Sequence, residues 1–184
     1  MTPRATDARG GTPLPPIPNS YWLPGGMVCA GEYPGHWSAR ERVGRLLDAG
    51  IRSFVDLTEE CDPLDSYDGI VRAAAAERGI EVAWKRMGIR DLDIPPRDQM
   101  AAILDHIDGE VAAGRRVYVH CWGGVGRTGT VVGCHFVRRG CSGAAALDRI
   151  AMLWRTMSAD KRSSFPESPQ TPAQRRFVRD WVEE

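Results

Sequence analysis

The sequence predicts one α/β domain with a largely parallel central sheet flanked by helices. Short apolar segments alternate with longer segments of helical periodicity, an order that is typical of parallel sheets. The length of 184 residues suits one domain, and a hydrophobic fraction of 42% is enough to bury a core without metals or disulfides. We therefore expect one domain over residues 20–184, preceded by a flexible segment rich in Pro and Gly at residues 1–19.

In the first half of the chain, Gly residues and polar clusters separate the expected elements. Ser38 has the character of an N-cap, with Glu41 three residues on, and the helix that follows is expected to end near Gly50. An Ala-rich helix is expected to end before Gly79. The expected elements are strand 27–30, helix 39–50, strand 51–57, helix 67–78 and strand 81–86.

The second half begins with a loop at residues 87–96, which contain a glycine, several charges and two prolines. The helix after it carries an apolar face at the spacing of an amphipathic helix. The members of that face are Met100, Ile103, Leu104, Ile107 and Val111. The expected elements are helix 97–113, strand 117–120, helix 127–139, helix 142–157, loop 159–172 and helix 172–182.

Charge and cysteine content narrow the function classes. The formal net charge is zero, so composition gives no general attraction for nucleic acid or acidic membranes. The five cysteines include no Cys-x-x-Cys pair, which suggests neither a disulfide framework nor a zinc site. No apolar run approaches the roughly 18 residues that span a bilayer, and the N-terminus lacks the apolar stretch of a secretory signal. We expect a cytoplasmic protein with reduced thiols, without nucleic-acid or membrane partners, and leave its oligomeric state open.

The segment VYVHCWGGVGRTG, residues 117–129, combines a nucleophile with an anion-binding loop. An expected strand leads into Cys121, and Arg127 stands where a helix is expected to begin. Three glycines between them allow a tight curl whose N–H groups face inward, next to the positive end of the helix. Arg127 can bind two phosphate oxygens, and the positive surroundings stabilise the thiolate form of Cys121. The segment predicts a phosphate-binding loop made of Trp122, Gly123, Gly124, Val125, Gly126 and Arg127.

The order His120, Cys121, five residues, Arg127, Thr128 resembles the H-C-x5-R-[S/T] signature of protein tyrosine and dual-specificity phosphatases. The resemblance covers roughly residues 22–181 and implies a single-domain protein tyrosine phosphatase-like fold. It also implies hydrolysis of phosphotyrosine, and potentially of phosphoserine and phosphothreonine, in a phosphorylated protein substrate. The reaction would pass through a cysteinyl-phosphate, with no cofactor or metal.

Two flanking segments extend this resemblance. Residues 88–96 resemble the mobile loop that carries the general acid, which implies Asp91 as the acid and Asp93 as the fallback. Residues 169–174 resemble the glutamine loop of tyrosine phosphatases, in which Gln170, with Gln174 second, would orient the hydrolytic water.

The resemblance also implies supporting roles near the nucleophile. Thr128 would hydrogen-bond the sulfur of Cys121 and help it to leave, and His120 would orient the loop from beneath. Cys61, in a polar loop, could form a protective disulfide with Cys121 under oxidation, as in some family members.

Other interpretations of these residues stay open. Gly124-x-Gly126-x-x-Gly129 fits a dinucleotide-binding pattern, but Asp148, at the distance of the ribose ligand, lies in an expected helix. Within the family, lysines in the loop are typical of phosphoinositide phosphatases, and residues 122–125 contain no base, which favours a substrate with one phosphate. The alternatives are a phosphatase for phosphoinositide, inositol phosphate or RNA 5′-phosphate, and a catalytically inactive module that binds phosphoproteins.

Overall fold

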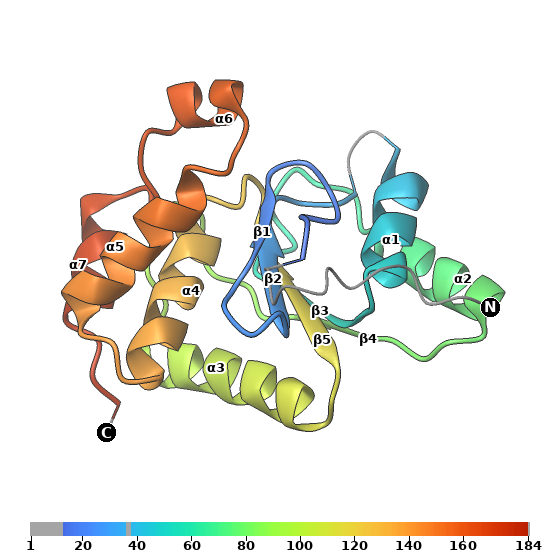
Figure 1. The fold of residues 1–184 in the computed structure, drawn as a ribbon, viewed down its shortest axis with the longest axis horizontal. Helices are drawn as coiled ribbons and strands as arrows, with labels where there is room; N and C mark the ends of the chain where they lie inside the picture. Colours follow the sequence, from blue (N-terminus) through green and yellow to red (C-terminus); the bar gives the residue numbers. More distant parts are fainter. Residues whose placement is uncertain (1–12, 36–37, 184) are drawn as a thin grey trace.

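A five-stranded sheet forms the centre of the computed structural model, which describes residues 13–35 and 38–183 (Figure 1). The strand order is β1-β2-β5-β3-β4; β2, β5, β3 and β4 run parallel, and β1 is antiparallel to β2 at the edge. The predicted largely parallel sheet is therefore confirmed. The strands are β1 (Ser20–Trp22), β2 (Val28–Gly31), β3 (Ile51–Asp56), β4 (Ala83–Arg86) and β5 (Arg116–His120).

Helices cover both faces of the sheet, as Figure 1 shows. One face carries α1 (Ala39–Asp48) and α2 (Asp68–Arg78); the other carries α3 (Arg97–Ala112) and α4 (Gly126–Arg138). Behind α4 pack α5 (Gly143–Trp154) and α7 (Pro172–Arg179), and the short α6 (Ala159–Ser164) stands at one end of the molecule. A separate cluster of buried apolar side chains lies on each side of the sheet, so the sheet is the middle of three layers.

Three local expectations are wrong. β1 lies in a stretch without an expected strand, because three buried residues are too few to show alternation. α6 lies in the expected loop 159–172; a single short helix capped by the Ser158 side chain has too few residues for a periodic signal. Ser38 does precede α1, but its φ is 63° and its side chain makes no capping bond.

Helix boundaries otherwise follow the predicted stop signals. Gly79 ends α2 in the left-handed conformation with φ 61°, as its lack of a Cβ permits. Of the expected flexible segment, residues 1–12 lie outside the described residues. Ile17 is buried in the core beside α1, so the end of that segment packs on the domain.

The ends of the parallel strands bring four loops together. Asp56 at the end of β3 pairs in register with His120 of β5 and with Arg86 of β4, and Gly31 of β2 pairs with His120 from the other side. The loops that leave these strands therefore start at the same edge of the sheet, where α/β proteins bind ligands. Those loops contain residues 32–35, 57–66, 87–96 and 121–125.

Candidate active site

The loop between β5 and α4 is tightly curled. Gly124 has φ +71°, and a Cβ added there would lie 2.5 Å from the backbone carbonyl of Gly31. A Cβ added at Gly126 would lie 2.9 Å from the amide oxygen of Gln174. Gly124 is therefore required by the approach of β2, in agreement with the curl predicted from the sequence, and Gly126 leaves room for the Gln174 amide.

Cys121 and Arg127 are both buried at this loop, with exposed fractions of 3% and 1%. Cys121 lines a cavity of about 530 Å³ together with Trp122, Gly123 and Val125. Although burial acts to lower it, the pKa of Arg127 is raised above its ordinary value by the neighbouring Cys121 and by two aspartates. The nucleophile candidate and the guanidinium thus interact electrostatically across the loop.

One side of the Arg127 guanidinium is anchored by protein groups. Its Nη1 donates to Asp62 Oδ2 at 2.6 Å and to the carbonyl oxygen of Ile89 at 3.0 Å. Its Nε and Nη2, which form the opposite edge, are buried and make no hydrogen bond among residues 13–35 and 38–183. Two parallel N–H groups of this kind fit two oxygens of one tetrahedral anion. Thr128 Oγ1, also buried, likewise has no hydrogen-bond partner within those ranges.

The two candidate acids are placed differently. Asp91 lines the cavity with a half-exposed side chain, and its Oδ1 lies 3.1 Å from Arg127 Nη2. Asp93 does not line this cavity, and its Oδ1 accepts a hydrogen bond from the backbone N–H of Ile94 at 2.9 Å. The structure therefore brings Asp91, and not Asp93, to the cavity that holds Cys121.

The two candidate glutamines also differ. Gln170 lines the cavity with Cys121. Gln174 is fully buried: its Oε1 accepts from the N–H of Thr171 at 3.1 Å, and its Nε2 donates to the carbonyl oxygen of Asp93 at 3.0 Å. Because both ends of its amide are engaged, Gln174 connects α7 to the loop of the candidate acids, and Gln170 is left as the glutamine that reaches the cavity.

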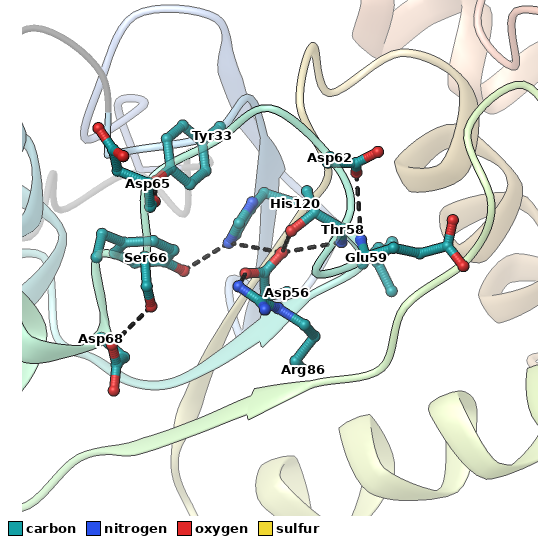
Figure 2. A network of polar contacts seen from close by, with 12 residues as sticks. Tyr33, Asp56, Thr58, Glu59, Asp62, Asp65, Ser66, Asp68, Arg86 and His120 are labelled. Atoms are coloured by element: carbon teal, nitrogen blue, oxygen red, sulfur yellow. Dashed lines mark hydrogen bonds and ion pairs between the residues drawn. The ribbon is translucent and has the colours of Figure 1, made fainter.

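A buried polar network lies beneath the loop (Figure 2). His120 and Asp56 point toward one another, with 4.0 Å between His120 Nε2 and Asp56 Oδ1, and Thr58 donates to Asp56 from both its N–H and its hydroxyl. Burial lowers the pKa of His120, so the ring is neutral near pH 7. Its Nδ1 then donates to the carbonyl oxygen of Cys121 at 3.0 Å, and its Nε2 accepts from the Tyr67 hydroxyl.

Several residues of the site were missed by sequence reasoning. Asp62 anchors Arg127, yet its segment was recognised only as a polar loop, and its position carries no spacing signal. Glu32, Arg42 and Lys161 line the same cavity as Cys121, although they come from three distant parts of the chain.

The described part of the chain holds no group of three or more His, Cys, Asp or Glu residues arranged to bind a metal. None of its helices has the length and apolar character that crossing a membrane requires. All five cysteines are free thiols, and Cys61 is exposed, with its sulfur 3.9 Å from Glu59 Oε2.

Comparisons with known proteins agree with the resemblance seen in the sequence. The family described as "Polymorphic toxin system, DSP-PTPase phosphatase" matches residues 28–141, more than half of the chain. "Putative tyrosine phosphatase 067L" from Invertebrate iridescent virus 3 is 32% identical over 105 residues, which are 54% of this chain and 40% of that protein. The chain thus matches less than half the length of this curated relative.

Solved structures share the fold. The active form of Tk-PTP has a TM-score of 0.59 and 25% identity, with coverage of 85% of this chain and 94% of that one. PTPMT1 in complex with PI(5)P gives a TM-score of 0.62 at 20% identity, with coverage of 84% and 88%. Kinase associated phosphatase gives 0.61 at 16%, with coverage of 82% and 83%. These likenesses confirm the predicted single-domain α/β architecture.

Proposed function

This chain belongs to the DSP-PTPase phosphatase family of polymorphic toxin systems, and on that premise we propose that it hydrolyses phosphotyrosine in a protein substrate through a cysteinyl-phosphate. Phosphoserine and phosphothreonine are further candidate substrates of the same site. The virus protein that matches this chain is described as a tyrosine phosphatase, which supports the choice of phosphotyrosine. A cytoplasmic location, compatible with five free thiols, is part of the proposal.

In the proposed first step, the Cys121 thiolate attacks phosphorus and the bond from phosphorus to the leaving oxygen breaks. Asp91 donates a proton to that oxygen, which leaves as the phenol. Arg127 binds two of the three equatorial oxygens through Nε and Nη2, and the loop amides bind the third. This step is supported by the position of Asp91 at the cavity and by the buried guanidinium edge.

In the proposed second step, water attacks phosphorus, and its proton goes to the Asp91 carboxylate. The bond between phosphorus and sulfur breaks, which restores the Cys121 thiolate and releases inorganic phosphate. Gln170 places the water, and the Thr128 hydroxyl donates to the leaving sulfur. Neutral His120 takes no proton in either step; it fixes the Cys121 carbonyl, so that the loop amides keep their inward orientation.

The observation that carries the proposal is that the two edges of the Arg127 guanidinium have different surroundings. One nitrogen is fixed by Asp62 and Ile89, while on the opposite edge Nε is buried without a hydrogen-bond partner in the described ranges and Nη2 lies 3.1 Å from Asp91 Oδ1. Leaving the buried Nε donor without a partner costs several kcal/mol, roughly, so such an edge is retained where an anion binds.

Turnover of an aryl phosphate, followed with and without vanadate, tests the proposal. The wild-type chain should be active and inhibited by vanadate, and Cys121→Ser should bind phosphate but show no turnover. Cys134→Ser, a change at a buried cysteine of α4 outside the cavity, is the matched control and should remain active. Activity of Cys121→Ser equal to that of the wild type would refute the assignment of the nucleophile.

The substrate class needs a separate panel. Phosphotyrosine, phosphoserine and phosphothreonine peptides should be compared with inositol phosphates, a phosphoinositide and an RNA 5′-phosphate. The proposal expects the highest kcat/KM on phosphotyrosine peptides. A higher value on one of the non-protein substrates would assign the chain to the alternative class.

A further inference from the structure

Two cations stand in the wall of the cavity, outside the phosphate-binding loop. Arg42 comes from α1 and Lys161 from α6, and both line the cavity together with Cys121. Their side chains are only 16% and 13% exposed, so they are held in place rather than extended into solvent. Residues 122–125 of the loop contain no base, but the rest of the cavity wall contributes these two.

Glu32 holds the two cations side by side. Its Oε1 lies 2.8 Å from Arg42 Nη2, and its Oε2 lies 3.0 Å from Lys161 Nζ. Asn19 also donates to Oε2, at 3.1 Å, which fixes the carboxylate. One carboxylate between two cations leaves one net positive charge on this group of three side chains, and the Lys161 ammonium keeps donors that Glu32 does not use.

Lys161 lies next to the phosphate-binding loop. A Cβ built at Gly123 would be 3.7 Å from Lys161 Nζ, so the ammonium lies over the backbone of the loop itself. The ring of Phe165, 5.8 Å from Nζ, lines the same cavity. A group bound to Lys161 would therefore be a near neighbour of the phosphate bound by the loop.

We propose that Lys161 and Arg42 form a subsite for a second anionic group of the substrate, a carboxylate or phosphate on a residue that flanks the phosphotyrosine. The inference rests on the proposed function and specifies its substrate class as an acidic or multiply phosphorylated peptide. Glu32 presents the two cations to that group, and the excess positive charge attracts it. The loop amides and Arg127 bind the phosphate that is cleaved, whereas Lys161 and Arg42 bind the second anion, so the two anions do not compete for the same donors.

Matched phosphotyrosine peptides test this inference. The members of a pair differ only in glutamate or glutamine at the positions flanking the phosphotyrosine, and a third peptide carries a second phosphate there. The measured quantity is the ratio of kcat/KM between the anionic and the neutral peptide. For partly buried charges we expect a ratio of about three to ten in the wild type, falling as salt is added.

Variants identify the cations. Lys161→Gln and Arg42→Gln should each bring the ratio close to one. Arg45→Gln, on the same helix as Arg42 but exposed and paired only with Glu41, is the matched control and should keep the wild-type ratio. If Lys161→Gln fails to fold, as judged by circular dichroism, the salt dependence of the wild-type ratio decides the question.

Each outcome bears on a distinct claim. A wild-type ratio near one with good turnover of the peptides, or an unchanged ratio in Lys161→Gln, would overturn the inference and leave the proposed function standing. Turnover of inositol phosphates but of none of the phosphotyrosine peptides would overturn the proposed function and the peptide subsite together.

Discussion

The phosphate-binding loop and the loop of the candidate acid meet at one cavity but are held in opposite ways. Cys121, Arg127 and Thr128 are almost completely buried, and glycines allow other segments to touch the loop directly. Asp91 is half-exposed, and Leu92 beside it is 52% exposed with a φ of 63°. The candidate phosphate-binding loop is thus built into the core, whereas the exposed side chain of the candidate acid contacts Arg127, and backbone carbonyls of its loop accept hydrogen bonds from Gln99, Arg127 and Gln174.

The largest loss of activity should come from a change in the buried phosphate-binding loop. Arg127→Lys keeps the charge but loses the two-pronged edge, and it leaves Asp62 with a poorer partner. We expect kcat/KM for an aryl phosphate to fall by about a thousandfold or more. Arg86→Lys, which alters a longer contact of 3.5 Å to Asp56 and a cation–π contact with Trp84, is the control. A loss of similar size in both variants would mean that general destabilisation, not phosphate binding, explains the result.

Substitution of the candidate acid in the exposed loop should lower kcat by an amount that depends on the leaving group of the substrate. Asp91→Asn removes the proton donor, so kcat should fall by about a hundredfold to ten-thousandfold for a phosphotyrosine peptide. The loss should be smaller for an aryl phosphate whose leaving group needs no proton. Asp93→Asn, two residues away and outside the cavity, should change kcat little. If Asp93→Asn lowered kcat more than Asp91→Asn does, the acid would be Asp93 and not Asp91.

Acidic pH should weaken the buried scaffold beneath the phosphate loop. Burial lowers the pKa of His120, and burial beside Arg139 lowers the pKa of His135 in α4 to about 4. For both side chains the unfolded chain binds a proton near pH 6.5 and the folded chain only at lower pH, so stability is fully present above pH 6.5 and declines as pH falls; for His135 the decline continues to about pH 4. For His135 the loss should reach about 3 kcal/mol.

Urea unfolding across this pH window measures the effect. His135→Gln can keep an acceptor for Arg139, which donates to His135 Nδ1 at 3.0 Å, but it cannot titrate. This variant should therefore lose less stability between pH 6.5 and pH 4 than the wild type does. Equal pH dependence in the two proteins would show that His135 is not a source of it.

The smallest expected effect separates the two glutamines. Gln174→Ala leaves the N–H of Thr171 and the carbonyl of Asp93 without their partner, so the free energy of unfolding should fall by about 2 kcal/mol. Gln170→Ala should leave stability nearly unchanged but slow the release of phosphate from the intermediate, seen as a larger burst of product. If Gln170→Ala were the more destabilising change, the comparison of their contacts would be wrong.

The two loops also differ in how far the sequence alone predicts their candidate functional residues. Cys121, Arg127 and the glycines could be singled out from the sequence because one continuous segment carries the whole candidate phosphate-binding loop. Asp91 could be singled out only by family resemblance, since a carboxylate in an exposed loop has no periodic or spacing signal. Asp62, Glu32, Arg42 and Lys161 reach the cavity through the sheet order and through α6, and local sequence cannot specify contacts between such distant segments.

The fold was predictable for a related reason. Parallel strands buried on both faces are apolar and end at glycines or polar clusters, so β3, β5 and their helices were visible in the pattern. β1 and α6 are short, and they form because the rest of the domain offers them a surface to pack on. Short elements of that kind depend on tertiary contacts more than on local propensity.

The contact between Gly124 and Gly31 joins the loop that carries Cys121 to strand β2, and it leaves no space for a side chain at either position. A side chain at Gly124 would strike the backbone of Gly31, and one at Gly31 would strike the Tyr118 hydroxyl and the carbonyl of Asn19. Neither steric conflict can be relieved by a compensating change at a single neighbour, because two of the colliding groups are main chain. Both positions therefore exclude a side chain although neither contributes a functional group, and β2 cannot shift along β5 without reshaping the loop that carries Cys121.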